Sequence, residues 1–402
     1  MLSATARPYI EASVPVLREH GLNITRTFYQ NMLGAHPELK NLFNMGNQAS
    51  GIQQQSLASA VFAYAANIDN PAALAPVVKR IVHKHAAVGI KPEHYPIVGK
   101  HLLDAIKQVL GDAASDELLA AWGEAYWLLA DLLIEEEKVL YAATATTAGA
   151  LMPLKVARKV FESEHIVSFY LQHPDGRKPG DFLPGQYISV EMQFDGGRSR
   201  QLRQYSLSDS SAAPWWRISI KREEETDQPQ GRVSNWLHDE VKVGDLIQAT
   251  PAFGDFVLNP VISEQPLLLL SAGVGITPLL SMLNSVRDLA PQRKVFFAYA
   301  ARSPAWQSHS LDLQEARGRM SNLTTALFYE SLEGAYGSIG GVRQGLMDVT
   351  TLWPEALENA DIYMCGPLGF MQAQREQLLK AGVTADQIHR EVFGPDLLDH
   401  LL

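Results

Sequence analysis

The sequence predicts three folded parts in order: an all-α domain, an antiparallel β-barrel, and an α/β domain with a parallel, Rossmann-like sheet. Apolar residues follow a helical period in the first third, a period of two after Pro153, and alternating strand and helix patterns from about Pro266. A length of 402 residues fits two or three domains. The expected divisions are a first domain at 1–141, a linker at 142–152, a second domain at 153–262 and a third at 263–402.

The first domain is predicted to consist of several short to medium helices. Leu118, Trp122, Ala125, Leu129 and Leu132 recur at helical spacing, and β-branched runs are scarce. Helix breaks are expected where glycine and proline stand, at Gly21, Pro37, residues 46–51, Pro71, Pro92 and Gly111. The small, uncharged segment 142–151 is interpreted as an interdomain connection, although an alanine-rich helix end would look similar.

The remaining two thirds carry the strand signals. Five short period-two runs, separated by Gly, Pro and Asp turns, predict a small antiparallel barrel or sandwich; they lie at 155–161, 165–172, 187–192, 217–221 and 246–250. Further strand-like runs at 267–270, 294–299 and 361–364 alternate with helical patterns. That alternation predicts a parallel sheet.

Composition and charge exclude several classes of protein. With 34 Lys and Arg against 44 Asp and Glu, the net charge is −10, which disfavours binding to nucleic acid or to anionic membranes. The single cysteine, Cys365, excludes an intrachain disulfide and a cysteine-based zinc or iron–sulfur site. Neither a signal peptide nor an apolar run near the ~18 residues of a membrane span is visible. We expect a cytoplasmic monomer.

Two segments of the second domain suggest a flavin site. Arg203, Gln204, Tyr205 and Ser206 end a strand-like segment, where a cation, a ring and a hydroxyl could face one ligand. Gly231, Val233 and Ser234 open a helical segment whose backbone N–H groups could bind a pyrophosphate. A solvated strand end and simple helix capping are the plainer alternatives.

The third domain carries a nicotinamide signal directly after its first strand. Gly273 and Gly275 would allow the backbone to approach a dinucleotide at a helix N-terminus. Pro278 stands where the usual fingerprint has a third glycine, and it suits a first helical turn. The segment Ala272-Gly273-Val274-Gly275-Ile276-Thr277-Pro278 is therefore similar to the G-x-G-x-T-P element of the ferredoxin–NADP reductase superfamily.

Two later segments match the same superfamily. Cys365 precedes Gly366 and Pro367 at the end of a strand, where the superfamily places a cysteine near the nicotinamide ring. Near the C-terminus, the superfamily places an aromatic ring over the flavin, and this chain has Glu391, Val392, Phe393, Gly394 and Pro395. Core packing is the alternative explanation for Cys365 and Phe393.

The helical domain suggests a haem pocket. Residues 36–43 have the look of a globin segment that places Phe43 against a porphyrin. Gln53 and Leu57, four residues apart, would share a helix face. Together with Tyr29 they could line the distal side, with Tyr29 and Gln53 as hydrogen-bond partners of dioxygen and Leu57 as an apolar wall.

The proximal ligand must be a neutral imidazole, and four histidines qualify by type: His83, His85, His94 and His101. His85 is favoured because a short loop separates it from Tyr95, and because Glu135 stands near the end of the long helical segment after Trp122. A carboxylate on the second ring nitrogen makes a ligating imidazole a stronger donor. Glu135, assisted by Tyr95, is the expected partner, although it begins a Glu-Glu-Glu run that could be a solvated helix end.

With these motifs in order, the whole chain resembles the flavohaemoglobins, the nitric oxide dioxygenases of bacteria and fungi. The resemblance implies a globin, an FAD-binding barrel and an NAD(P)-binding domain. It makes His85 the proximal ligand of haem b, with Tyr95 and Glu135 as its charge-relay pair, and it places Tyr29, Lys84 and Glu391 where the family tunes cofactor potentials. The residues that it assigns to FAD are Tyr187, Arg203, Gln204, Tyr205, Ser206, Val392, Phe393, Gly394 and Pro395.

The implied activity is nitric oxide dioxygenation, in which NAD(P)H reduces FAD, FAD reduces haem, and dioxygen at the haem converts nitric oxide to nitrate. A general flavin-haem NAD(P)H oxidase or reductase is the alternative reading, and an oxygen or redox sensor a third. Arg302 and Ser303 follow the second strand of the α/β part, which leans slightly toward acceptance of NADPH. An exposed loop would carry such residues equally well.

Overall fold

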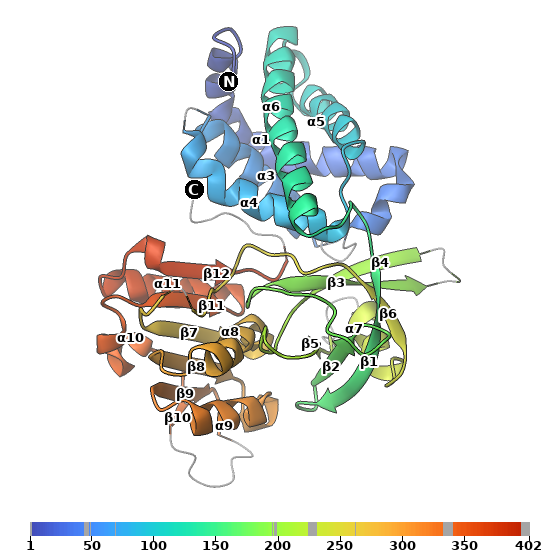
Figure 1. Cartoon of the computed structure of the whole chain (residues 1–402). Coiled ribbons are helices and arrows are strands. Elements are labelled where there is room, and N and C mark those ends of the chain that lie inside the picture. Colours follow the sequence, from blue (N-terminus) through green and yellow to red (C-terminus); the bar gives the residue numbers. More distant parts are fainter. Residues whose placement is uncertain are drawn as a thin grey trace. The chain divides into compact units, whose positions relative to one another are not determined.

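The computed structural model describes residues 2–43, 48, 50–68, 70–194, 196, 199–223, 231–261, 263–332 and 341–394 (Figure 1). It forms two compact units. The first contains Met1–Leu151, Glu191–Arg203 and Gly394–Leu402, and the second contains Met152–Val190 and Gln204–Phe393. Pro395, one of the residues expected to bind flavin, lies outside the described residues.

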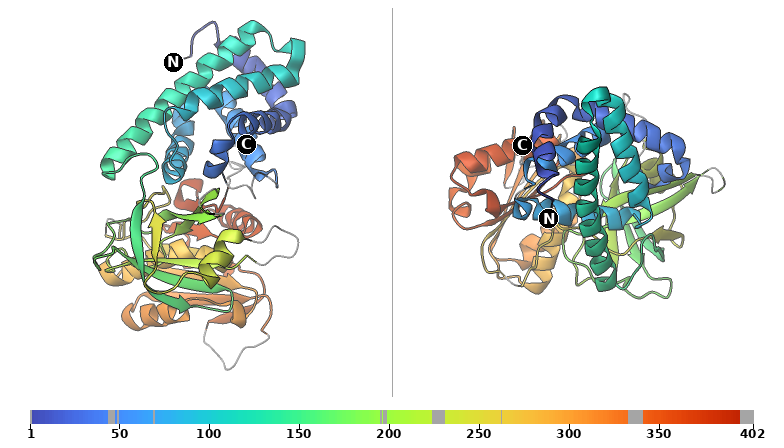
Figure 2. Two further views of the ribbon diagram at one scale, coloured as in Figure 1. Left: turned by 90° about the vertical axis from the view of Figure 1, so that its right-hand side faces the viewer. Right: turned by 90° about the horizontal axis from the view of Figure 1, so that it is seen from above.

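The N-terminal part of the first unit is helical, as predicted. Its helices are α1 (Arg7–Ala35), η1 (Pro37–Leu42), α3 (Ile52–Ala66), α4 (Pro71–Val88), α5 (His94–Leu110), η2 (Gly111–Ala113) and α6 (Asp116–Ala143). Helices α5 and α6 run side by side in the views of Figures 1 and 2. Ser115 caps α6, because its hydroxyl accepts a hydrogen bond from the Leu118 N–H at 3.2 Å. No described helix combines the length and the apolar character needed to cross a membrane.

The expected break at Gly21 is wrong, since α1 continues through it to Ala35. Gly21 is buried, and a Cβ added there would lie 3.7 Å from the Cβ of Ala58 on α3. A small residue at this helix crossing serves close packing rather than a turn. The breaks at Pro71 and Gly111 are confirmed, because α4 begins at the first and α5 ends before the second.

An antiparallel sheet follows, and the barrel prediction is confirmed. Its strands are β1 (Met152–Phe161), β2 (Ile166–Gln172), β3 (Tyr187–Phe194), β4 (Ser199–Ser206), β5 (Trp216–Lys221) and β6 (Leu246–Ala249), and α7 (Arg232–Asp239) lies between β5 and β6 in the chain. The strand order is β4-β3-β6-β1-β2-β5. An antiparallel bridge from Leu207, directly after β4, to Ile218 on β5 links the two ends of that order.

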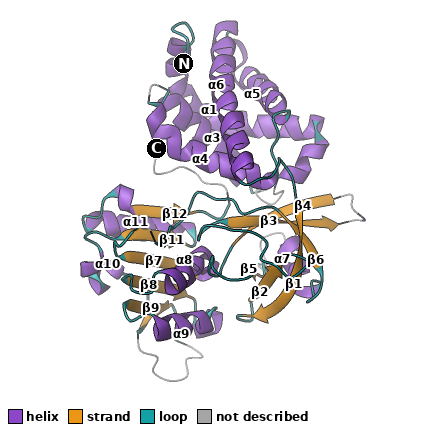
Figure 3. Cartoon of the chain, in the orientation of Figure 1, coloured by secondary structure: helices purple, strands orange, loops and turns teal. Residues whose placement is uncertain are grey.

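The last part is a parallel sheet with helices, as the alternating pattern predicted (Figure 3). Its strands are β7 (Leu267–Ala272), β8 (Val295–Ala301), β9 (Leu323–Tyr329), β10 (Val342–Gln344), β11 (Asp361–Cys365) and β12 (Ile388–Glu391). Its helices are η4 (Gly273–Gly275), α8 (Ile276–Leu289), η5 (Pro304–Trp306), α9 (Ser310–Arg319), α10 (Val349–Leu352), η6 (Pro354–Ala356), α11 (Leu368–Lys380) and η7 (Ala385–Gln387).

The order of this second sheet is β10-β9-β8-β7-β11-β12, so the chain reverses direction across the sheet between β7 and β11. Alternate side chains of the strands enter two apolar clusters. One cluster includes residues of α8 and α9, and the other includes residues of α10 and α11. Helices therefore cover both faces of the sheet. In such folds, ligands bind at the carboxyl ends of the strands where the order reverses.

Inside the second unit, buried charges join the barrel to the α/β part. The guanidinium of Arg217 on β5 contacts both carboxylate oxygens of Asp312 on α9, at 2.9 and 3.1 Å. The side chain of Asn284 on α8 donates to Asp312 at 2.7 Å and to Asp209 at 3.0 Å. Arg217 is only 3% exposed, so its charge depends on these carboxylates for compensation.

Replacing Arg217 by Met should therefore destabilise the second unit. The change leaves two largely buried carboxylates without their cation, at a cost of about 3–5 kcal/mol. Thermal unfolding followed by tryptophan fluorescence would report it, since Trp215 and Trp216 are its chain neighbours. Lys380→Met is the control, because Lys380 pairs with Glu376 at an exposed site. An unchanged midpoint in Arg217→Met would contradict the proposed role of the network.

Candidate functional site

A buried polar cluster of the helical domain surrounds His85. The Nδ1 atom of His85 lies 2.8 Å from Oε1 of Glu137 and 3.0 Å from the hydroxyl of Tyr95. Tyr95 in turn donates to the same oxygen of Glu137 at 2.6 Å. Three helices supply these groups: α4 carries the imidazole, α5 the phenol and α6 the carboxylate.

Burial determines the protonation of Tyr95 in this cluster. The side chain of Glu137 is 3% exposed, and an isolated carboxylate there would be costly unless donors surrounded it. Burial, together with the hydrogen bond to Glu137, raises the pKa of Tyr95 far above its ordinary value. Tyr95 therefore keeps its proton and remains a donor at physiological pH.

Packing holds Tyr95 in this position. The hydroxyl of Tyr126 on α6 donates to the carbonyl oxygen of Tyr95 at 2.6 Å. The Tyr126 ring lies against Gly99 on α5, where an added Cβ would come within 2.5 Å of a ring carbon. Gly99 thus permits the close approach of α5 and α6 on which the geometry of the cluster depends.

The expected partner of His85, Glu135, is wrong. Its carboxylate is 64% exposed and pairs with Lys138 at 3.2 Å. Two residues along a helix rotate a side chain by about 200°, so Glu135 and Glu137 point to nearly opposite sides of α6. The signal that could have identified Glu137 is its spacing from the buried residues Ala130 and Leu133, seven and four positions earlier.

The geometry of His85 suits a metal ligand. Because Nδ1 faces a carboxylate, its proton points to Glu137 and Nε2 carries the free lone pair. None of the contacts described for His85 uses Nε2, and the side chain is 32% exposed. A carboxylate on one ring nitrogen and an open second nitrogen suit an imidazole that would hold a haem iron.

The predicted distal residues also lie together. The Nε2 group of Gln53 on α3 donates to the hydroxyl oxygen of Tyr29 on α1 at 3.5 Å. The ring of Phe43 meets that of Tyr29 edge-on, with centroids 5.7 Å apart, and Leu57 packs against the same apolar cluster. Burial raises the pKa of Tyr29 to about 12, so its hydroxyl stays protonated.

The predicted flavin residues of the barrel occupy three places. Arg203, Gln204, Tyr205 and Ser206 form the end of β4, as expected. Tyr187 begins β3 and bridges to Phe253, and a Cβ added at Gly254 would meet its ring at 3.1 Å. Gly231 is the N-cap residue of α7, with Val233 and Ser234 buried in its first turn. These strand ends and this helix start are suited to a phosphate-bearing ligand.

The predicted nicotinamide residues meet where the parallel sheet reverses its order. Ala272 ends β7, Gly273, Val274 and Gly275 form η4, and Ile276 and Thr277 open α8. A Cβ on Gly275 would lie 2.3 Å from the carbonyl oxygen of Cys365, at the end of β11. Only glycine allows this loop to pass so close to the neighbouring strand, at an edge of the kind where dinucleotides bind.

Cys365 is fully buried, and burial raises the pKa of its thiol well above the ordinary value, with the charge of Glu391 adding to the effect. The two residues are register partners in the parallel pair β11 and β12. A thiol in that environment stays protonated, which agrees with a packing role beside the ligand edge rather than a nucleophilic one.

The C-terminal segment continues from β12. Val392 packs against the second apolar cluster of the sheet, whereas the ring of Phe393 is 48% exposed. Within the first unit, Lys84, next to His85 on α4, donates from Nζ to the carbonyl oxygen of Gly394 at 2.9 Å. An exposed ring at this place could cover a planar ligand.

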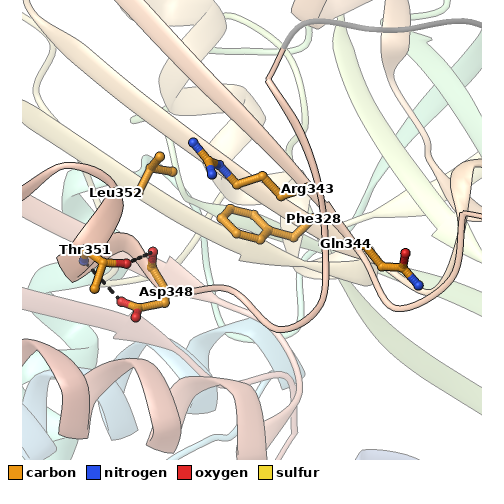
Figure 4. A pocket seen from close by; sticks show the side chains of 6 residues that line it. All are labelled: Phe328, Arg343, Gln344, Asp348, Thr351 and Leu352. Carbon is orange, nitrogen blue, oxygen red and sulfur yellow. Dashed lines mark hydrogen bonds between the residues drawn. The ribbon is translucent and has the colours of Figure 1, made fainter.

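A pocket of about 370 Å³ at another part of the parallel sheet contains none of these residues (Figure 4). It is lined by Phe328, Arg343, Gln344, Asp348, Thr351 and Leu352. Asp348 is already engaged there, because it accepts hydrogen bonds from the backbone of Thr350 and Thr351 and so caps α10. We assign no function to this pocket.

Three protein-family models match the chain in the predicted order. They are Globin over residues 26–133, the oxidoreductase FAD-binding domain over residues 152–257 and the oxidoreductase NAD-binding domain over residues 269–376. A haem-binding helical domain followed by this pair defines an oxidoreductase that contains both haem and flavin.

Relatives that match this chain over nearly their full length are named flavohemoproteins. The flavohemoprotein of Bordetella parapertussis is 46% identical, covering 98% of this chain and 99% of the relative. The flavohemoprotein of Rhizobium meliloti is 45% identical, with 99% of each covered. The crystal structure of the flavohemoglobin from Malassezia yamatoensis, with bound FAD and heme, is 30% identical at a TM-score of 0.85, covering 98% of this chain and 100% of that one. The chain therefore belongs to the flavohaemoprotein family, and its cofactors are haem, FAD and a nicotinamide dinucleotide.

The role of Glu137 as the partner of His85 can be tested by a matched pair of substitutions. Glu137→Gln removes the charge that strengthens the imidazole, and we expect turnover to fall by roughly 10- to 100-fold. The midpoint potential of the haem should rise, because a weaker donor stabilises the ferric iron less. Glu135→Gln should leave both quantities unchanged. Spectroelectrochemistry and the iron–histidine stretch in resonance Raman spectra would measure the difference, and equal effects of the two variants would contradict the assignment.

The close approach of the Gly275 loop to β11 can also be tested by substitution. Gly275→Ala places a methyl group against the carbonyl oxygen of Cys365, so the loop must shift. Displacement of a bound reactant by about 1 Å can cost about 100-fold in rate, and we expect a loss of that order in flavin reduction by the nicotinamide. Anaerobic stopped-flow absorbance would measure it. Gly369→Ala on α11 is the control, since an added Cβ there meets nothing within 4 Å.

Proposed function

We propose that the protein is a nitric oxide dioxygenase, with the overall reaction 2 NO + 2 O₂ + NAD(P)H → 2 NO₃⁻ + NAD(P)⁺ + H⁺. The observation that carries the proposal is that one helical domain contains both an imidazole held by the buried Glu137 and a tyrosine–glutamine pair. The flavohaemoprotein relatives support it, as does the likeness to the FAD/NAD-binding domain of nitric oxide dioxygenase from Vibrio cholerae. That domain is 37% identical to this chain at a TM-score of 0.55. The match covers 61% of this chain and 99% of the Vibrio cholerae domain.

The cofactors supply the electron chemistry: a flavin accepts a two-electron hydride and passes on single electrons, which is what a haem iron can accept. The residues of the chain set the conditions for it. Glu137 and Tyr95 hold the Nδ1 proton of His85, which leaves Nε2 free to bind the iron. His85 would hold the haem iron through Nε2, and a strongly donating imidazole would favour reduction of dioxygen by the bound haem.

Among the predicted distal residues, Tyr29 would donate a hydrogen bond to the reacting oxygen. Gln53 donates to the tyrosine oxygen, which leaves the O–H of Tyr29 to donate onward. Because its pKa is raised to about 12, this proton is not lost at physiological pH. The apolar side chains of Phe43 and Leu57 would keep water from competing for the same donor.

The proposal on the coenzyme rests on the surroundings of Arg302. The guanidinium of Arg302, directly after β8, lies 4.8 Å above the ring of Trp306, which in turn stacks on His165 at 3.8 Å. An arginine supported in this way could receive a ribose 2′-phosphate, so we propose that the enzyme accepts NADPH as well as NADH.

The activity can be tested on the purified protein loaded with haem and FAD. We expect NADH or NADPH without air to reduce flavin and haem, and nitric oxide added with dioxygen to return the haem to the ferric state with stoichiometric nitrate. If nitric oxide does not accelerate oxidation of the coenzyme and no nitrate forms, the general NAD(P)H oxidase replaces this proposal. Peroxide release in place of nitrate would point the same way.

Tyr29→Phe removes the distal donor and keeps the ring. We expect nitrate formation to fall by roughly 100-fold, the usual cost of losing one donor aimed at developing negative charge. The dissociation rate of dioxygen should rise in the same variant, measured by flash photolysis. Tyr9→Phe, on the same helix but 39% exposed, is the matched control. An equal loss in both variants would mean that Tyr29 acts through folding alone.

A further inference from the structure

Another pocket lies in the helical domain, beside the predicted distal residues, and it shares Tyr29 with them. It has a volume of about 310 Å³ and lies between the C-terminal half of α1, η1 and the start of α3. Its polar lining consists of Arg26, Tyr29, Gln30, Lys40, Gln48 and Gln54. Arg26, Tyr29 and Gln30 share one face of α1, since they are three and four positions apart.

The charge of this pocket is positive in a chain that is acidic as a whole. Arg26 and Lys40 are exposed at its rim, and within the described part of the chain neither forms an ion pair. No carboxylate is among the lining residues; Glu38, close to Lys40 in sequence, instead lies 3.2 Å from His36. Two unpaired cations with no acidic neighbour on the lining favour an anion.

Two buried amides add hydrogen-bonding groups that the protein leaves unused. Gln48 and Gln54 are each 9% exposed. The Nε2 of Gln54 donates to the side-chain oxygen of Gln48 at 3.0 Å and to its carbonyl oxygen at 3.2 Å. Nε2 of Gln48 and Oε1 of Gln54 then have no partner among the described residues. Buried polar groups normally have partners, so a ligand that accepts a hydrogen bond from Gln48 is indicated, with a water on Gln54.

The N-terminus of α3 also favours an anion in this pocket. This helix begins at Ile52 after Gly51, with no side-chain cap and no acidic residue in its first turn. The positive end of its dipole is therefore not compensated by a side chain of that turn. Gln54, the third residue of α3, lines the pocket.

We propose that this pocket binds a small inorganic oxyanion, and that in the working enzyme the anion is nitrate, the product. Arg26 and Lys40 supply the charge, and the amide of Gln48 supplies a directed donor. Tyr29 lines the pocket and is also the proposed distal donor, so the pocket lies beside the place where nitrate would form. The choice of nitrate rests on the proposed function, whereas the oxyanion site does not.

The test is calorimetric titration of the full-length holoprotein with sodium nitrate at constant ionic strength. The haem iron is reduced and blocked with carbon monoxide, so that nitrate cannot bind at the metal. We expect saturable binding of one nitrate per chain. Arg26→Gln/Lys40→Gln should weaken it at least tenfold, and Gln48→Met, which removes the donor with little change in volume, should weaken it as well.

Lys100→Gln/Lys138→Gln removes the same net charge from two exposed ion pairs on α5 and α6. This control should bind nitrate as the unaltered protein does. Absence of saturable binding, or equal weakening in both double variants, overturns the site. Binding without any nitrate formation from nitric oxide would instead leave the oxyanion site standing and remove the proposed function. Nitrate formation from nitric oxide without saturable nitrate binding would support the proposed function and remove the oxyanion site.

Discussion

The helical domain depends on one buried interaction, the contact of the Glu137 carboxylate with Nδ1 of His85. A carboxylate that is 3% exposed is tolerated only when donors surround it, and Tyr95 and His85 are those donors. Because they come from α5 and α4, the carboxylate on α6 requires three helices to meet at one place. The same contact fixes which imidazole nitrogen is free, and thereby which one can serve iron.

The reductase part is organised by a comparable constraint. Arg217, Asp209 and Asp312 are nearly buried, and their mutual compensation joins the barrel to α9. Asn284 ties α8 to the same carboxylates, and α8 is the helix that follows the glycine loop. The strand end at Ser206 lies only three residues before Asp209. One polar network thus connects the neighbourhood of the predicted flavin residues with that of the predicted nicotinamide residues.

The positions that could be predicted are those in contiguous motifs. Arg203 to Ser206 form the end of one strand, and Gly273 to Thr277 lead into a helix, so neighbouring residues suffice to place them. His85 could be selected because a tyrosine and a carboxylate were expected nearby. The prediction of Glu135 failed because this residue differs from Glu137 only in helical phase. That phase follows from the buried face of α6, which Ala130 and Leu133 define and Leu132, 45% exposed, does not.

The sequence by itself determined the order of the three folds and the chemistry of the cofactors, because period, glycine placement and short motifs are local properties of the chain. Tertiary structure decided what depends on contacts between distant segments. It selected the carboxylate that faces His85, it made Gly21 a packing residue rather than a break, and it brought Arg26, Lys40 and the amide of Gln48 around one pocket. Those outcomes depend on how helices cross, and no single segment encodes a crossing.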